Sequence, residues 1–183
     1  RQLILKIGER GWIGMSWPKE YGGREADIID QYIFEEELAR ARVPLNLGNF
    51  IEQAPAIMKA GTEAQKKYFL PRLVKGEVTF ALGYSEPSGG TDILSLTTRA
   101  AMEGNQWSVN GQKLFTTFAG EADAIAVLCR TDPIENGKRA RGLSLVLTPR
   151  HQKGVEVRRL ELMGMRAGGT SEVFFDDARA PSD

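Results

Sequence analysis

The chain has 183 residues, of which 42% are hydrophobic, and its 24 lysine and arginine residues are balanced by 24 aspartate and glutamate residues. This size and apolar content support one large domain or two small ones. The balanced charge argues against a nucleic-acid-binding protein, which would carry a basic patch. Cys129 is the only cysteine, so an internal disulfide and a cysteine-based metal site are excluded.

The given residues carry neither a candidate membrane-spanning segment nor a candidate signal segment. No apolar run is long enough to span a bilayer, and no basic-then-apolar signal segment opens the chain. A single cysteine fits a reducing compartment. Because the first residue is Arg1 rather than methionine, we expect further residues to precede it.

The first 76 residues carry a helical pattern. Apolar residues recur at three- and four-residue steps over residues 28–38, and Pro44 is expected to end that helix. A second helix is expected over residues 51–59. A third is expected to open with a capping box, in which the Thr62 hydroxyl accepts from the amide of Gln65. We expect Pro71 to kink or split this last helix.

From residue 77 on, short segments rich in β-branched and aromatic residues alternate with turn residues. The pair Asn110-Gly111 predicts a type I′ hairpin turn that places Trp107 across from Leu114. Many short strands with no helical segment between them predict an antiparallel barrel or sandwich. The predicted fold is therefore an α+β, two-domain protein, with an N-terminal helical bundle over residues 1–76 and a β domain over residues 77–183.

The segment YSEPSGGTD, residues 84–92, combines adjacent glycines with the hydroxyl groups of Ser85, Ser88 and Thr91. A phosphate-binding loop is excluded, because it needs a following helix and residues 93–98 are predicted to form a strand. Two interpretations remain. The segment is either an ordinary turn whose hydroxyls bond to its own backbone, or a rim of hydrogen-bond donors around a polar ring.

The segment NGQKLFTTFAG places Phe115 and Thr117 on one face of a predicted strand, because side chains alternate with a period of two. An aromatic face and a hydroxyl at this spacing could stack on a ring and donate to its edge. A core phenylalanine beside a strand threonine explains the pattern equally well, and the sequence leaves both interpretations open.

Taken together, several segments resemble the acyl-CoA dehydrogenase family in order and in spacing. They are GWIGMSWPKEYGG, EEELAR, GTEAQKKYFLPRLVKGE, YSEPSGGTD, VNGQKLFTT and MGMRAGGTSEVFFDDARAP. The resemblance implies a flavoprotein that binds FAD and forms an α,β double bond in acyl-CoA thioesters. It also implies a homo- or hetero-oligomer that passes electrons to an acceptor protein, in the bacterial cytoplasm or, in a eukaryote, the mitochondrial matrix.

The resemblance also assigns roles to individual residues. Ser85 stands where the family hydrogen-bonds the pyrimidine edge of the flavin, and Thr117 where a threonine hydroxyl reaches the flavin N5 atom. Phe115 replaces a tryptophan that packs against the ring, and Thr91 is expected to contact the thioester substrate as well. The residues expected to bind FAD are Leu82, Tyr84, Ser85, Gly90, Thr91, Phe115 and Thr117.

The resemblance assigns no catalytic residue to this chain. The family's catalytic glutamate belongs to a third, helical domain, which we expect to lie beyond Asp183. By the same resemblance, Glu86 is expected to be structural and to cap its turn. Cys129 is expected in the core and His151 in a solvated loop, and no metal site is expected.

Two segments, YSEPSGGTD and FTTFAGEADAIAVLCRTD, resemble most a bacterial branch of the family that often handles bulky or steroid-derived acyl-CoA thioesters, commonly as mixed-subunit assemblies. Two other functions stay open. The chain could be a non-catalytic partner subunit that supplies only structure or half a site. It could also be a flavin-free binding module that joins a β-barrel to helices.

Overall fold

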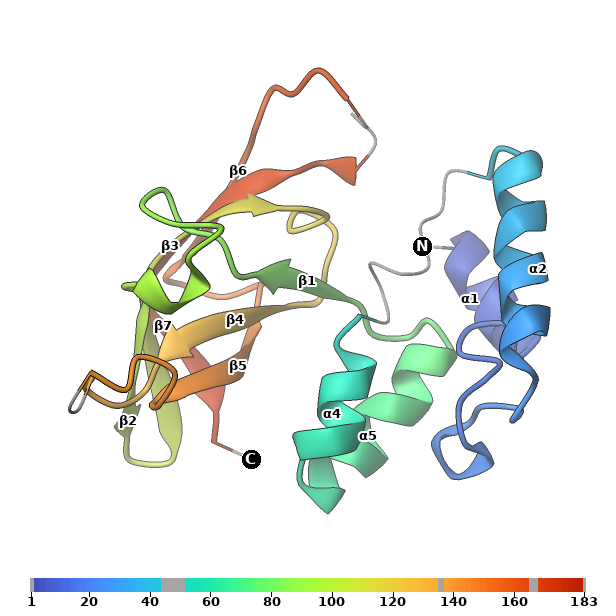
Figure 1. Ribbon diagram of the computed structural model, residues 1–183, viewed down its shortest axis with the longest axis horizontal. Coiled ribbons are helices and arrows are strands. Elements are labelled where there is room, and N and C mark those ends of the chain that lie inside the picture. Colours follow the sequence, from blue (N-terminus) through green and yellow to red (C-terminus); the bar gives the residue numbers. More distant parts are fainter. Residues whose placement is uncertain (1, 44–51, 135–136, 165–167, 183) are drawn as a thin grey trace. The chain divides into compact units, whose positions relative to one another are not determined.

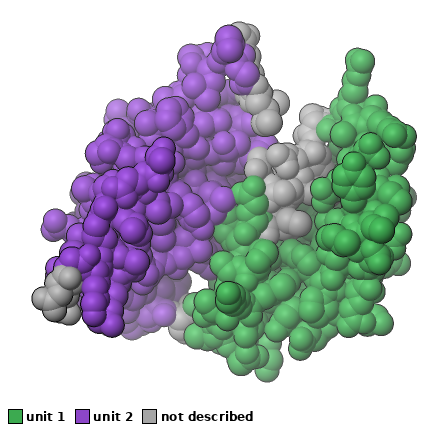
Figure 2. Space-filling model, in the orientation of Figure 1, with its two compact units in different colours: residues 1–79, 183 green, residues 80–182 purple. Residues whose placement is uncertain are grey.

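The structure is a computed structural model, which describes residues 2–43, 52–134, 137–164 and 168–182. It divides into two compact units, residues 1–79 and residues 80–182 (Figure 2). The α-helices of the described residues all belong to the first unit, and the strands all belong to the second. The predicted fold class, a helical domain followed by a β domain, is confirmed.

The helical unit is built from short segments, as the apolar pattern predicts. They are α1 (Gln2–Glu9), η1 (Lys19–Tyr21), α2 (Ile28–Arg40), α4 (Ala54–Ala60) and α5 (Glu63–Val74). The helix α2 already ends at Arg40, and Pro44, its predicted end, lies outside the described residues. Within the described residues, no helix is both long enough and apolar enough to cross a membrane.

The helix α5 begins as predicted and does not break as predicted. Thr62 Oγ1 accepts from Gln65 N at 3.2 Å, and Gln65 Oε1 accepts from Thr62 N at 3.0 Å, which confirms the capping box. Pro71 lies inside one continuous helix, so the expected split is wrong. Its missing N–H removes only one bond, to the carbonyl four residues earlier, and one turn before the helix end this loss is tolerated.

The buried face of α2 is not the face that its most apolar residues predict. Gln31 is buried, and the Phe34 ring packs at 5.3 Å from the ring of Trp12, in the loop that follows α1. The four apolar side chains on the other side of the helix are exposed: Ile28, Ile29, Tyr32 and Ile33. Apolar spacing therefore identified the helix but did not identify its packed side.

The β unit is one curled seven-stranded sheet (Figure 1). Its strands are β1 (Phe80–Gly83), β2 (Arg99–Glu103), β3 (Gln106–Thr116), β4 (Ala124–Arg130), β5 (Leu143–Pro149), β6 (Val155–Arg159) and β7 (Ser171–Pro181). The order is β1-β4-β2-β3-β7-β6, and β5 pairs with β4. Val109, Ile125 and Val173 are fully buried in its core.

Two of the strand pairings are parallel, which the purely antiparallel prediction missed. The strand β1 pairs with β4 over Ala124–Val127, and β2 joins the same strand at Arg130. Both therefore run along β4 in the same direction, and the segment between them leaves the sheet after Gly83 and returns at Thr98. The remaining pairings among the described residues are antiparallel.

Residues 93–98, predicted as a strand, form the short 3-10 helix η2 (Ile93–Ser95) and an irregular stretch. The physical reason lies in the hydrogen bonds of the next residues. The amides of Thr97 and Thr98 donate to the carboxylate of Glu86 and are not available to a neighbouring strand. No α-helix follows the loop either, so a phosphate-binding loop stays excluded.

The hairpin predicted at Asn110-Gly111 is wrong, because both residues lie inside β3. The β2–β3 hairpin turns instead at Gly104, whose φ is 65°. The side chain of Asn110 bonds to Asp177 of β7, and a Cβ atom at Gly111 would lie 2.5 Å from Thr98 Oγ1. The pair therefore lies at a bulge within β3 rather than at a turn. Trp107 is paired with Met102 of β2 and not with Leu114.

Candidate functional site

The loop over residues 84–92 presents hydroxyl groups that are not used within the protein. The side-chain oxygens of Ser85, Ser88 and Thr91 make no hydrogen bond to any residue that the structure describes. Ser95, just beyond the loop, does bond back, to the carbonyl of Asp92 at 2.7 Å. The structure therefore does not support a turn closed by its own hydroxyls, and these groups are available to a ligand.

The loop lies against the second half of β3. Leu114 N donates to the carbonyl of Ser85 at 2.8 Å, and this bond places Ser85 beside the residue that precedes Phe115. A Cβ atom at Gly90 would lie 3.7 Å from Ser85 Oγ, so Gly90 also lies near Ser85. Leu82 is half-buried in β1, and Tyr84 is half-buried at the start of the loop. The exposed Thr91 has no hydrogen bond to the other predicted residues.

Phe115 owes its exposure to a β-bulge. The register between β3 and β7 shifts between Lys113 and Thr116, and Phe115 has a φ of 58° there. Its side chain is 57% exposed, so it is not a core residue. A non-glycine residue at positive φ costs about 1–3 kcal/mol, and such residues cluster at ligand sites. The bulge also breaks the period of two on which the shared face of Phe115 and Thr117 was predicted.

Thr117 follows β3 and pairs with a residue that the sequence did not single out. Its Oγ1 atom lies 3.2 Å from Oγ1 of Thr170, and both side chains are half-buried. The turn is held by a bond from Phe118 N to the carbonyl of Gly168 at 2.8 Å. The signal for Thr170 was present in the segment MGMRAGGTSEVFFDDARAP, but a threonine directly after a glycine pair is common.

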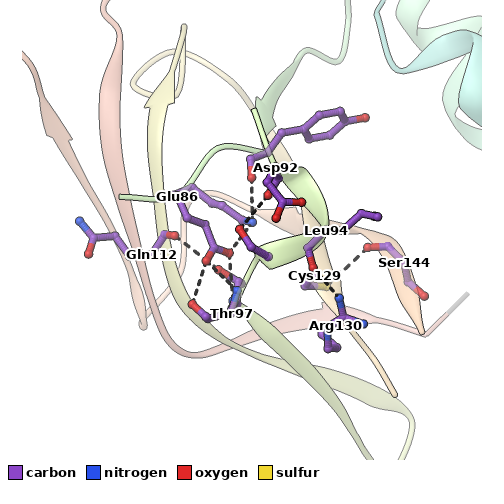
Figure 3. Close-up of polar contacts among 12 residues, drawn as sticks. Glu86, Asp92, Leu94, Thr97, Gln112, Cys129, Arg130 and Ser144 are labelled. Carbon is purple, nitrogen blue, oxygen red and sulfur yellow. Dashed lines mark hydrogen bonds and ion pairs between the residues drawn. The ribbon is translucent and has the colours of Figure 1, made fainter. Parts of the chain in front are cut away.

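Glu86 is buried and fully engaged in hydrogen bonds (Figure 3). Its carboxylate accepts from Thr97 N at 2.7 Å, Thr97 Oγ1 at 2.8 Å, Thr98 N at 2.9 Å and Lys113 Nζ at 2.9 Å. Burial acts to raise the pKa of this carboxyl, but the bonds from Thr98, Lys113 and Thr97 outweigh it and lower the pKa to about 2. A carboxylate so held is a structural anion and cannot act as a catalytic base.

Lys113 is the other half of this buried ion pair, and it was not among the residues predicted for the site. Its side chain is fully buried, and its Nζ atom also donates to the carbonyl of Tyr84 at 3.1 Å. Burial lowers the pKa of this lysine, while Glu86 opposes the shift. The signal was that Lys113 is the only charged residue of β3, which only the position of Glu86 could explain.

The remaining candidate residues contribute no chemistry to this site. Cys129 is buried in β4, and burial raises the pKa of its thiol to about 11. His151 is exposed. No group of three His, Cys, Asp or Glu side chains in the described ranges could hold a metal ion. Arg139, in the basic cluster of residues 138–141, forms an exposed ion pair with Asp92 at 2.6 Å.

Comparison with known proteins assigns both units. Residues 1–77 match the model of the acyl-CoA dehydrogenase N-terminal domain, and residues 81–178 match the model of the acyl-CoA dehydrogenase middle domain. The chain belongs to the acyl-CoA dehydrogenase family. Membership explains why a helical unit precedes a curled sheet, and it confirms the resemblance drawn from the sequence motifs.

Individual acyl-CoA dehydrogenases match over the whole chain. Acyl-CoA dehydrogenase FadE29 of Mycobacterium tuberculosis is 40% identical over 100% of this chain and 46% of its own length. The ChsE4-ChsE5 complex of the same organism superimposes with a TM-score of 0.87 and 38% identity, over 99% of this chain and 46% of that one. The Tcur3481-Tcur3483 steroid ACAD superimposes with a TM-score of 0.86 and 37% identity, over 99% of this chain and 46% of that chain. The chain therefore spans about half the length of these relatives.

Proposed function

We propose that this chain forms the FAD-binding face of an enzyme that dehydrogenates acyl-CoA thioesters. One observation carries the proposal: the donors of Ser85 are unpaired among the described residues, and its carbonyl is bonded to Leu114 N, one residue before the exposed Phe115 in its strained bulge. A flat heterocycle with a polar edge is the ligand that uses both. The family of the chain supports the same ligand.

The donor set fits a flavin. Ser85 would donate to the pyrimidine edge, with the backbone of Leu82, Tyr84 and Gly90 beside it. Phe115 would cover part of one ring face, and Thr117 would donate at the N5 side. When bound, FAD supplies the acceptor for the hydride that leaves the substrate β-carbon. Donors aimed at the edge that gains negative charge stabilise the reduced ring.

The substrate is proposed to approach past Thr91, whose exposed hydroxyl has no partner among the described residues. Removal of the thioester α-proton needs a positioned base. Glu86 is excluded by its four hydrogen bonds, so we place the base in the part of the relatives' length that this chain does not span. Electrons would then pass to an acceptor protein in the cytoplasm or the mitochondrial matrix.

A visible spectrum of the full-length protein tests this function. Oxidised flavin gives a yellow colour and an absorbance band that bleaches when a substrate reduces the flavin. The rate of bleaching with a panel of acyl-CoA thioesters of increasing bulk also identifies the preferred acyl group. We expect bulky or steroid-derived thioesters to bleach the band fastest. A protein that neither copurifies with FAD nor binds added FAD would be a flavin-free module, and the proposal would be wrong.

A second function is favoured by one structural neighbour. The ChsE4-ChsE5 structure is a complex of two differently named chains, and this chain matches it over 99% of its own length. The protein is therefore also a candidate for one subunit of a mixed acyl-CoA dehydrogenase. Native mass spectrometry of the protein purified from its source decides between one type of subunit and two.

A further inference from the structure

The buried lysine of β3 holds the start of the loop at two points. Lys113 Nζ donates to the carbonyl of Tyr84 at 3.1 Å and to Glu86 Oε1 at 2.9 Å. The intervening residue is held by the next strand residue, since Leu114 N donates to the carbonyl of Ser85 at 2.8 Å. Three consecutive loop residues are thus fixed to two consecutive strand residues.

These bonds set the direction of one amide. The structure has no cis peptide bond among the described residues, so the carbonyl of Tyr84 and the N–H of Ser85 lie in one peptide plane and point in opposite directions. With the carbonyl turned to Lys113, the Ser85 N–H points away from the ion pair. No described residue accepts a hydrogen bond from this amide.

We propose that Lys113 is a positioning residue, which holds the Tyr84 carbonyl so that the Ser85 N–H faces the FAD edge as a fixed donor. The inference rests on the proposed flavin site and adds to it a residue that does not touch the ligand. Lys113 acts through the peptide plane between Tyr84 and Ser85.

Glu86 has a separate part in this arrangement. A buried ammonium without a partner is strongly unfavourable, and Glu86 supplies the opposite charge at 2.9 Å. The same carboxylate holds the amides of Thr97 and Thr98, which fixes the end of the loop segment. Glu86 thus keeps Lys113 buried and charged, while Lys113 Nζ donates to the carbonyl of Tyr84.

Two variants of the full-length protein separate these parts. Glu86→Gln removes the charge pair but leaves a lysine that donates to Tyr84 even when neutral. The double variant Lys113→Met with Glu86→Gln differs from it only by the loss of that donor. Val109→Ala, at a buried core position of the same strand, serves as a control for lost stability. The readouts are the FAD dissociation constant, from flavin fluorescence, and crystal structures of the variants without FAD.

We expect the double variant to bind FAD about tenfold more weakly than Glu86→Gln, the loss of roughly one aligned hydrogen bond. Val109→Ala should lower the melting temperature by about as much as the double variant does, yet bind FAD within about twofold of the wild type. In the crystal structures, the Tyr84 carbonyl should keep its direction in Glu86→Gln and lose it in the double variant.

Three outcomes would overturn the inference. Equal FAD affinity of Glu86→Gln and the double variant would make Lys113 purely structural. A Tyr84 carbonyl that keeps its direction without Lys113 would contradict the inference even if FAD binding fell. A wild-type protein that binds no FAD would overturn the proposed function, and this inference with it, whatever the carbonyl does.

Discussion

The Oγ1 atoms of Thr117 and Thr170 lie 3.2 Å apart, so one hydroxyl donates to the other. A hydroxyl has one proton and two acceptor lone pairs. If Thr170 donates to Thr117, the proton of Thr117 stays free for a ligand, whereas the reverse direction uses it up. A ligand that accepts from Thr117 therefore makes Thr170 the donor of the pair, and both threonines contribute to one hydrogen bond with the ligand.

Thr117→Val should slow flavin reduction in the full-length protein and shift its absorbance band, with little change in acyl-CoA affinity. The lost donor acts where the hydride arrives and not along the acyl chain. We expect the reduction rate to fall by about a hundredfold, the lower end of the loss that follows removal of one oriented donor. Thr170→Val should give a smaller change in the same direction, and Thr170→Ser should restore it. Stopped-flow reduction measures all three, and a normal rate for Thr117→Val would refute its role.

Phe115→Gly should weaken FAD binding without weakening the fold. The substitution removes the cost of a positive φ, about 1–2 kcal/mol, and this gain offsets the entropy that glycine loses on folding. We expect the free energy of unfolding to stay within about 1 kcal/mol of the wild type. Phe174→Gly, at a half-buried position in β7, is the control: it should destabilise the fold and leave FAD affinity unchanged. Urea denaturation and FAD titration provide the two measurements, and a Phe115→Gly variant with normal FAD affinity would remove Phe115 from the site.

Gly111→Ala should destabilise the β unit far more than Gly104→Ala. A Cβ atom at Gly111 would lie 2.5 Å from Thr98 Oγ1, and its φ of 146° suits only glycine, so we expect a loss of at least about 3 kcal/mol. Apart from its two chain neighbours, no described residue has an atom within 4 Å of a Cβ at Gly104, so only its positive φ is penalised there, by about 1 kcal/mol. Urea denaturation of both variants tests the position of the hairpin. Equal losses would show that Gly111 does not pass close to Thr98.

Glu86 should make the protein sensitive to acid between about pH 4.5 and pH 2. Its pKa is about 2 in the folded protein and 4.5 as the ordinary value, so the folded state favours the carboxylate. The stability that this shift provides is present above pH 4.5 and is lost as the pH falls toward 2. Each unit of pKa difference corresponds to about 1.4 kcal/mol, so the free energy of unfolding should fall by an amount on the order of 3 kcal/mol.

The comparison with Glu86→Gln isolates this contribution, because glutamine does not titrate. Its free energy of unfolding, measured in urea at pH 7 and at pH 3, should fall by less than that of the wild type. Glu156→Gln is the control, since the exposed pair of Glu156 with Arg158 is screened by solvent. If the free energy of unfolding falls by the same amount between pH 7 and pH 3 in the wild type and in Glu86→Gln, the lowered pKa of Glu86 is contradicted.

Local sequence chemistry predicted the features that depend on a few neighbouring residues. The capping box of Thr62 and Gln65 forms as expected, because its two bonds join residues three apart and need no tertiary partner. The change from helices to strands near residue 77 was visible in the composition alone. The loop over residues 84–92 was singled out for its hydroxyl groups, and three of them are unpaired among the described residues.

The tertiary structure decided what those local patterns left open. Asn110-Gly111 has the composition of a turn, yet Asp177, 67 residues further along the chain, bonds to Asn110 and keeps the pair inside β3. The lone charge of Lys113 in its strand had no explanation until Glu86, 27 residues earlier, was placed beside it. The bulge that exposes Phe115 depends on the register with β7.

The sequence alone thus determined the family, the two domains and the residues to inspect, because these follow from motifs and periodicity. Only the fold decided which polar groups are used inside the protein and which remain for a ligand, because hydrogen-bond partners are set by contacts between distant segments.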